Sequence, residues 1–297
     1  MTLLVIGARG QVAQSLVERA GDRGVDLIAM GRDTADIRDE AALKAAIAAV
    51  DPELVINASA YTAVDKAEDD EADAFAVNAA GPETLARLCA ARDIPLIHLS
   101  TDYVFDGTLD RPYSERDQVG PIGAYGRSKL AGELGATAAN DKCLILRTAW
   151  VYSPFGNNFL KTMLRLAADR DEVSVVADQH GTPTGALDIA DAILSMSESL
   201  LRAPTPDKFG VFNLVAAGEA TWADFAEHIF EVSRKAGGPY ARVRRIPTAD
   251  FPTRAKRPAN SRLDTSRLAQ IYGLTLPDWR ASTEDCVRRL ISKRVLS

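Results

Sequence analysis

The stretch TLLVIGARGQVA, residues 2–13, decides the fold. The apolar run Thr2–Ile6 predicts a buried strand, Gly7 and Gly10 follow it at once, and a helical pattern begins at Val12. Glycine in such a turn lets the backbone approach a pyrophosphate, and the helix N-terminus offers amide groups and a favourable dipole. The pattern GxxGxxA therefore predicts a dinucleotide site, with a turn that serves packing alone as the alternative.

Apolar runs alternate with helical patterns through the first half of the chain. We expect strands at Thr2–Ile6, Leu27–Met30, Leu54–Asn57, Pro95–Ser100 and Cys143–Arg147, with helices between them, including a long one over Ala72–Arg92. Continuous apolar strands separated by helices indicate a parallel sheet that is covered on both faces. The expected fold is α/β with a doubly wound parallel (Rossmann) sheet, whose ligands bind beyond the carboxyl ends of the strands.

The alternation weakens after residue 150, which suggests a smaller C-terminal substrate lobe. Val173–Val176 reads as a strand and Leu187–Leu201 as a helix, whereas residues 239–280 look irregular. We therefore expect a dinucleotide-binding domain formed by residues 1–152 plus roughly 171–202. The substrate-binding lobe would then comprise roughly residues 153–170 plus 203–297.

Composition excludes several classes of partner. The 297 residues are 46% hydrophobic and carry a net charge of −6, so neither nucleic acid nor a membrane surface is an expected partner. Three widely spaced cysteines fit a reducing compartment, and we expect a cytoplasmic protein. The three histidines lack metal-ligand spacing, so no metal site is expected, and His98 reads as a core residue inside a strand.

The residues after the second expected strand bear on the identity of the cofactor. NAD sites usually place an acid there for the ribose 2′-hydroxyl, but this strand ends in Met30-Gly31-Arg32. A guanidinium suits a 2′-phosphate, and Arg9 could add a second cation. These residues favour NADPH, although the adjacent Asp33 leaves NADH open and Arg32 could be a solvated surface charge.

Tyr125-Gly126-Arg127-Ser128-Lys129 places a phenol and an amine four residues apart, on one helical face. An ammonium beside the tyrosine would favour its phenolate and lower its pKa from about 10 toward neutrality. Thr101 follows the fourth expected strand, where its hydroxyl can hydrogen-bond a substrate oxygen beside the tyrosine. A threonine that bonds its own loop is the alternative.

Four motifs in order, GxxGxxA, residues 57–62 (NASAYT), residues 100–105 (STDYVF) and YxxxK, resemble those of the extended short-chain dehydrogenases/reductases. Within that class, residues 60–68, 147–152, 178–184 and 257–263 resemble the dTDP-4-dehydrorhamnose reductase family. The resemblance covers essentially the whole chain. It implies NADPH-dependent reduction of the C4 ketone of dTDP-4-dehydro-L-rhamnose to dTDP-L-rhamnose, a step of nucleotide-sugar and polysaccharide biosynthesis.

The resemblance also implies roles for individual residues. Thr101, Tyr125 and Lys129 would be catalytic. The cofactor set comprises Gly7, Gly10, Gln11, Val12, Asp36, Ile37, Ala58, Ser59, Ala60 and Tyr61, to which we add Arg32 and Lys129 for their chemistry. The substrate set comprises Thr62, Thr101, Tyr103, Tyr125, Trp150 and Arg257. The expected partner is a dTDP-sugar, and the protein would be a monomer or a homodimer.

Two departures from the family pattern have different weight. Ala13 replaces a third glycine, which the general fingerprint tolerates. Some relatives dimerise around magnesium held by glutamates, one of them early in the first helix, where this chain has Ala13-Gln14-Ser15-Leu16. Magnesium prefers oxygen ligands, usually carboxylates. We therefore do not expect a magnesium-bridged dimer.

Two other functions remain as alternatives. A nucleotide-sugar dehydratase or epimerase of the same fold would usually carry a second acid after the catalytic threonine, but Tyr103 follows Asp102 here. The other is a non-catalytic subunit resembling the regulatory subunit of methionine adenosyltransferase. The presence of Thr101, Tyr125 and Lys129 together argues for an enzyme.

Overall fold

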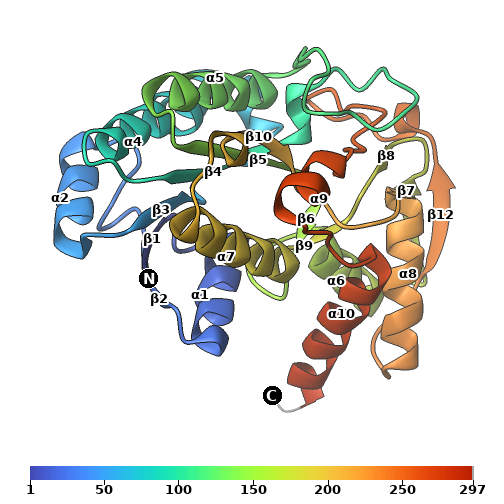
Figure 1. Cartoon of the computed structure of the whole chain (residues 1–297). Coiled ribbons are helices and arrows are strands. Elements are labelled where there is room, and N and C mark those ends of the chain that lie inside the picture. Colours follow the sequence, from blue (N-terminus) through green and yellow to red (C-terminus); the bar gives the residue numbers. More distant parts are fainter. Residues whose placement is uncertain (296–297) are drawn as a thin grey trace.

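The computed structural model describes residues 1–295 and is built around one six-stranded parallel sheet (Figure 1). Its strands are β1 (Thr2–Ile6), β2 (Asp26–Met30), β3 (Leu54–Asn57), β4 (Leu96–Thr101), β5 (Cys143–Thr148) and β10 (Gly210–Asn213). Their spatial order is β10-β5-β4-β3-β1-β2, so the chain reverses its direction of travel between β1 and β3. All pairs within the sheet are parallel, which confirms the predicted doubly wound fold.

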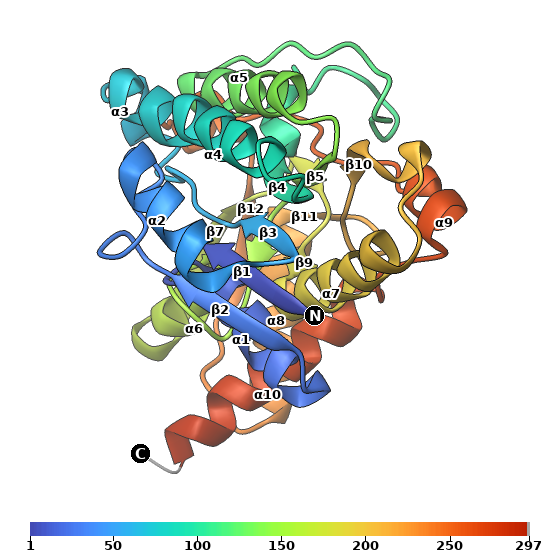
Figure 2. The same cartoon turned by 60° about the vertical axis from the view of Figure 1, so that its left-hand side comes forward.

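Helices cover both faces of the sheet (Figure 2). One face carries α1 (Gln11–Arg23) and α7 (Ala186–Arg202), and the other carries α2 (Glu40–Val50), α4 (Gly81–Ala90) and α5 (Ala124–Ala139). Successive side chains of β1 point to opposite faces of the sheet. Leu3 and Val5 pack with α1 and α7, while Leu4 and Ile6 pack against the helices of the other face. Every one of these four side chains is buried, which explains the uninterrupted apolar run.

The long helix predicted for residues 72–92 contains a break in its regular winding. It consists of α3 (Glu71–Phe75), a π-helical turn over Ala76–Ala80 and α4. Pro82, which has no backbone N–H, lies in the first turn of α4. The wider turn places Asn78 so that its side-chain oxygen accepts from the Tyr61 backbone N–H at 2.8 Å. The helix thereby supports the loop that follows β3.

A second hydrophobic cluster lies beside the sheet, at the right of Figure 1. It is formed by α6 (Phe159–Asp169), β7 (Glu172–Val176), α8 (Trp222–Lys235), β12 (Arg242–Ile246) and α10 (Trp279–Val295). Short pairs join this part to the rest: β6 (Val151–Tyr152) with β9 (Thr184–Gly185), and β8 (His180–Gly181) with β11 (Ala220–Thr221). The remaining elements are α9 (Ser266–Tyr272) and the 3-10 turns Lys66–Glu68, Asp102–Val104, Pro206–Lys208 and Thr248–Asp250.

Two strands lie differently from the division expected from the sequence. β7, which we grouped with the dinucleotide domain, pairs with β12 and packs in the second cluster. β10, which we grouped with the substrate lobe, pairs with β5 as the last strand of the large sheet. Val173 and Val175 bury in the second cluster, and Phe212 buries against α7, so side-chain packing explains both placements.

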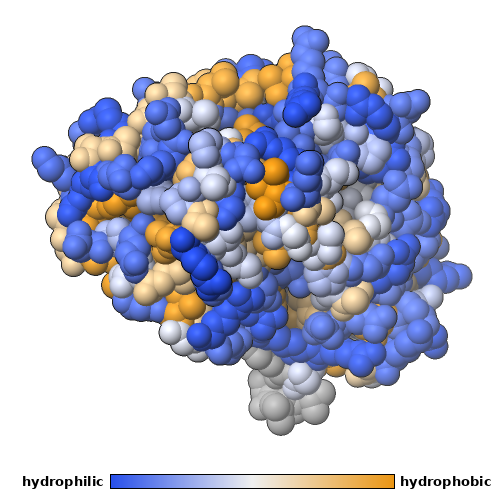
Figure 3. All heavy atoms as spheres, viewed as in Figure 1, coloured by the Kyte–Doolittle hydropathy of each residue, from blue (hydrophilic) through white to orange (hydrophobic). Residues whose placement is uncertain are grey.

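The outer surface is mostly hydrophilic on the face seen in Figure 3, with a hydrophobic strip along the top, over α5. Leu134 of α5 is the most exposed of the large hydrophobic side chains, at 65%. Within the described residues, no helix combines the length and the apolar character needed to cross a membrane.

Candidate active site

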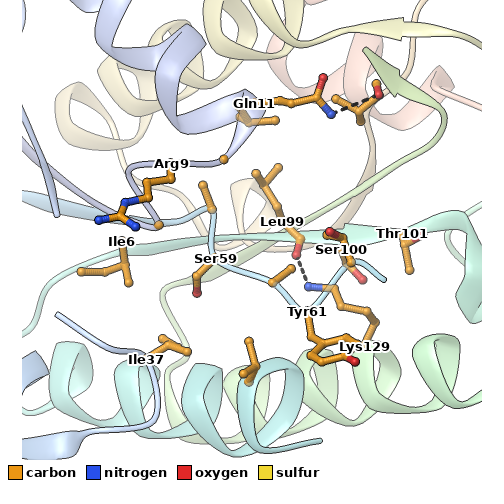
Figure 4. A pocket seen from close by; sticks show the side chains of 18 of the residues that line it. Ile6, Arg9, Gln11, Ile37, Ser59, Tyr61, Leu99, Ser100, Thr101 and Lys129 are labelled. Atoms are coloured by element: carbon orange, nitrogen blue, oxygen red, sulfur yellow. Dashed lines mark hydrogen bonds between the residues drawn. The ribbon is translucent and has the colours of Figure 1, made fainter. Parts of the chain in front are cut away.

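A cavity of about 670 Å³ opens at the carboxyl ends of the sheet strands. It brings together nearly all of the predicted site residues, and Figure 4 shows the loops that carry several of them. The predicted residues that line it are Gly7, Gly10, Gln11, Val12, Arg32, Asp36, Ile37, Ala58, Ser59, Ala60, Tyr61, Thr62, Thr101, Tyr103, Tyr125, Lys129 and Trp150. Arg257 is the one predicted residue that does not line it.

The glycine-rich turn packs closely against the loop after β3 and leaves the N-terminus of α1 uncapped. Gly7 has a φ of +108°, and a β-carbon there would lie 2.7 Å from the Ser59 backbone nitrogen. Gly10 is the N-cap of α1 and has no side chain that could accept a hydrogen bond from the first turn of the helix. The first turn contains no acidic residue. The helix N-terminus therefore meets the cavity without a competing negative charge, and the turn fits a dinucleotide.

The side chain of Gln11 has a separate task. Its carbonyl oxygen accepts hydrogen bonds from Ser153 at 2.9 Å and from the Asn158 amide at 2.8 Å. These bonds tie the phosphate turn to the segment that leads into α6. Gln11 can therefore offer an anion its backbone N–H, while its side chain holds the neighbouring loop.

Cationic side chains gather at the end of β2. Arg32 and Arg38 both donate to Asp36, with distances of 3.1 and 2.8 Å to Oδ2. Arg38, and to a lesser extent Arg32, hold the pKa of Asp36 well below its ordinary range. Arg9 lies 3.9 Å from Asp33, and both side chains are largely exposed. Asp33 does not line the cavity, whereas Arg9, Arg32 and Arg38 do.

Arg38 is a site residue that the sequence analysis missed. The available signal was a second basic side chain in the segment after β2, two residues beyond Asp36. Arg9, Arg32 and Arg38 all line this end of the cavity. Their guanidinium groups suit the 2′-phosphate of NADPH better than the ribose hydroxyls of NADH.

Thr101 and Tyr125 meet beside a buried carboxyl group. Thr101 donates to Asp102 Oδ1 at 3.0 Å and accepts from the Tyr103 backbone N–H at 3.2 Å. Burial raises the pKa of Tyr125, the negative charge of Asp102 raises it further, and a hydrogen bond with Thr101 opposes them. The expected lowering of this pKa is therefore wrong for this structure, since burial outweighs any help from Lys129. Tyr125 is a neutral phenol, the form that can give a proton.

Lys129 reaches inward from α5 to the end of β4. Its Nζ donates to the Leu99 carbonyl oxygen at 2.6 Å, as Figure 4 shows, and lies 3.5 Å from His98 Nε2. Burial lowers the pKa of Lys129 to about 8, while the Glu133 carboxylate opposes the shift. His98, interpreted from the sequence as a core residue, is buried but touches a residue of the site.

Aromatic rings form one wall of the cavity. Trp150 lines the cavity with a φ of +49°, a conformation that is unusual for a bulky residue. Its ring stacks on Trp222 with centroids 3.6 Å apart. Trp222, the first residue of α8, therefore supports the wall. The rings of Tyr103 and Tyr125 pack edge to face, with their centroids 5.5 Å apart.

Arg257 lies behind the wall. Its guanidinium donates to Asp65 Oδ2 at 2.6 Å, and it also hydrogen-bonds Tyr103. Arg257 can therefore act on a ligand only through Tyr103 or after a rearrangement. No cluster of three or more His, Cys, Asp or Glu side chains with metal-site geometry occurs in the described part of the chain.

The doubly wound sheet, the glycine turn and the threonine, tyrosine and lysine at one cavity define a short-chain dehydrogenase/reductase of the extended type. A family model described as RmlD substrate binding domain matches residues 1–292. A dTDP-4-dehydrorhamnose reductase of Sinorhizobium fredii is 45% identical, with 98% of each chain covered. The chain belongs to the dTDP-4-dehydrorhamnose reductase family.

Solved structures agree with this assignment. A dTDP-4-dehydrorhamnose reductase from Clostridium acetobutylicum has a TM-score of 0.90 and 36% identity, covering 98% of this chain and 99% of its own. The enzyme from Bacillus anthracis, solved in complex with NADP, has a TM-score of 0.88 and 31% identity, and the match covers 96% of this chain and 99% of that one.

Proposed function

We propose that this protein is an NADPH-dependent reductase that converts dTDP-4-dehydro-L-rhamnose to dTDP-L-rhamnose by reducing the C4 ketone. One observation carries the proposal: Thr101, Tyr125 and Lys129 line the same cavity as the glycine turn. A proton donor therefore stands in the cavity whose far end fits a dinucleotide. The family relatives, which bear the name of this reaction, support the choice of substrate.

When bound, NADPH would supply the hydride for reduction of the sugar C4 carbon. Tyr125 gives its phenolic proton to the C4 oxygen, because the buried phenol is protonated at neutral pH and is the form that can donate. The Thr101 hydroxyl hydrogen-bonds the same oxygen and orients it. Lys129, whose side chain is largely buried in the site, would hold the nicotinamide ribose.

At the other end of the cavity, Arg32 and Arg38 bind the 2′-phosphate. Their present partner, Asp36, would keep them in place before the cofactor arrives. The backbone of Gly10, Gln11 and Val12 binds the pyrophosphate at the N-terminus of α1. The sugar nucleotide then lies along Thr62, Tyr103 and Trp150, with the second hydrophobic cluster forming the substrate lobe behind Trp150 and Trp222.

The enzyme is proposed to act in the cytoplasm as a monomer or a homodimer. Its three cysteines are free and buried, which fits a reducing compartment. Light scattering behind a sizing column measures the assembly directly, with and without added magnesium. A mass above that of two chains contradicts this part of the proposal.

The reaction is tested by following NADPH oxidation after dTDP-4-dehydro-L-rhamnose is generated in situ. We expect oxidation that depends on the sugar, with dTDP-L-rhamnose as the product. If NADPH binds but is not consumed, the substrate is a different one or the protein is a binding subunit.

A further inference from the structure

A chain of buried polar groups runs behind Lys129, from the end of β3 to α5. Asn57 and His98 are both fully buried. The Asn57 side-chain oxygen accepts from the Ser59 backbone N–H at 3.1 Å and from the Ser59 hydroxyl at 2.6 Å. A backbone N–H can only donate, so this contact fixes which end of the amide is the oxygen. The Asn57 amide nitrogen consequently faces His98.

The orientation of Asn57 determines the tautomer of His98. The amide nitrogen lies 3.0 Å from His98 Nδ1, and since it donates, Nδ1 must accept. Burial, together with the charge of Lys129, lowers the pKa of His98 well below its ordinary value, so the ring is neutral. A neutral ring that accepts at Nδ1 carries its proton on Nε2. That N–H lies 3.5 Å from Lys129 Nζ.

We propose that His98 is a positioning residue that acts through Lys129: held by Asn57, it turns its Nε2–H toward the amine and favours the neutral amine over the ammonium. An ammonium offers only donors and opposes another donor, whereas a neutral amine has a lone pair that can accept. The inference rests on the proposed function for its consequence, although the side-chain geometry stands without it.

The other charged groups around Lys129 do not reverse this effect. Glu133, one turn later on α5, raises the pKa of Lys129, but its carboxylate is shared with Arg147 on β5 and with Ser100 on β4. Tyr125, one turn earlier, is a neutral phenol. Asp102, at the end of β4, acts on Tyr125 and is not among the groups that shift Lys129.

The consequence concerns the proton that Tyr125 loses. When the phenolic proton moves to the C4 oxygen, a phenolate remains. A Lys129 ammonium that is readily deprotonated returns a proton to it, becoming the neutral amine that His98 stabilises, and solvent then reprotonates the amine. A lysine with its ordinary pKa would give up this proton less readily.

Asn57→Asp is the decisive variant because it reverses the tautomer. The carboxylate still accepts from Ser59 but must also accept from His98, which moves the ring proton to Nδ1 and presents the Nε2 lone pair to Lys129. We expect the pKa of Lys129 to rise by roughly one to two units. It is measured by ¹³C NMR titration of lysine labelled at Cε, with the Lys129 signal identified by its loss in Lys129→Arg. The pH dependence of kcat should move in the same direction.

The added negative charge is controlled by repeating Asn57→Asp in a His98→Leu background. There, only the direct effect of the charge remains, so we expect a smaller rise. Equal rises in the two backgrounds, or no rise in either, would overturn the proposal.

A second measurement needs no variant at that position. The ¹⁵N shifts of the His98 ring in the wild-type enzyme report the tautomer, and we expect a proton on Nε2 and none on Nδ1 between about pH 5 and 8. A protonated Nδ1 would overturn the inference. Neither NMR experiment uses the sugar substrate, so their outcome is independent of whether the substrate assignment holds.

Discussion

Arg147 forms a two-point ion pair with Glu133 in the layer between β5 and α5. Arg147 Nε and Nη2 donate to the two carboxylate oxygens at 2.9 and 2.6 Å, and each side chain is only 4% exposed. The same carboxylate accepts from Ser100, the residue before Thr101, at 2.5 Å. The pair therefore joins the strand that carries Thr101 to the helix that carries Tyr125 and Lys129.

Glu133→Gln should lower the free energy of unfolding by about 3–5 kcal/mol, because it leaves the Arg147 guanidinium buried without its counter-charge. Urea denaturation measures the loss. Glu40→Gln, which breaks an exposed pair with Arg87 whose side chains are 54% and 55% exposed, is the matched control and should cost less than about 1 kcal/mol. Similar losses in the two variants would show that the buried pair has no special role.

Substitution of two glycines near α1 should have opposite effects. Gly7→Ala would place its β-carbon 2.7 Å from the Ser59 backbone nitrogen at a φ of +108°, so we expect a less stable protein that binds NADPH poorly. Gly21→Ala has no atom within 4 Å of the new carbon and lies inside α1, where alanine should stabilise by about 0.5–1 kcal/mol. Thermal unfolding and cofactor titration measure both variants, and normal NADPH binding by Gly7→Ala would contradict the site.

Arg32→Ala and Arg38→Ala should weaken NADPH binding by about tenfold each, as expected for the loss of a charged hydrogen bond. Binding of NADH should change little, because NADH has no 2′-phosphate for these side chains to contact. Fluorescence titration with both cofactors gives the ratio of the two Kd values. Arg87→Ala, which breaks an exposed ion pair between α4 and α2, is the control. An equal loss for both cofactors would mean that these arginines do not read the 2′-phosphate.

Asp102 should make the stability of the protein depend on pH. Burial raises the pKa of its carboxyl to about 6, above the unfolded value of about 3.9. The folded state thus holds a proton that the unfolded state releases, so this contribution to stability is full below about pH 4 and lost as the pH rises through 6. The free energy of unfolding of Asp102→Asn should therefore rise by roughly 2–3 kcal/mol, relative to that of the wild type, between pH 4 and pH 7. Chemical denaturation at the two pH values tests this, and a constant difference would contradict it.

The sequence was informative where local pattern and packing agree. The first five strands of the sheet are apolar and alternate with helices, so their positions could be predicted, and the loops at their carboxyl ends had to converge. β10 could not be recognised, since it has only four residues and follows a proline-containing loop. β12 reads as a charged cluster because Arg242, Arg244 and Arg245 occupy a strand that is largely exposed.

The parts of the site that escaped prediction depend on contacts between distant segments. His98 looks like any buried strand residue until Lys129 and Asn57 are placed beside it. Trp222 has the spacing of a core residue, and only its stack on Trp150 connects it to the cavity. The pKa of Tyr125 was misjudged because the Tyr-Lys spacing shows the ammonium but does not show how deeply the phenol is buried.

The most direct test of the central claim follows the fate of the hydride. The enzyme is given NADPH carrying deuterium at nicotinamide C4 together with dTDP-4-dehydro-L-rhamnose, and the product is examined by mass spectrometry and NMR. We expect deuterium on the sugar C4 of dTDP-L-rhamnose, with Tyr125→Phe still binding NADPH but slower by about 10²- to 10⁴-fold. Oxidation without label at C4, or unchanged turnover in Tyr125→Phe, would contradict the proposed reaction and the role of Tyr125 in it.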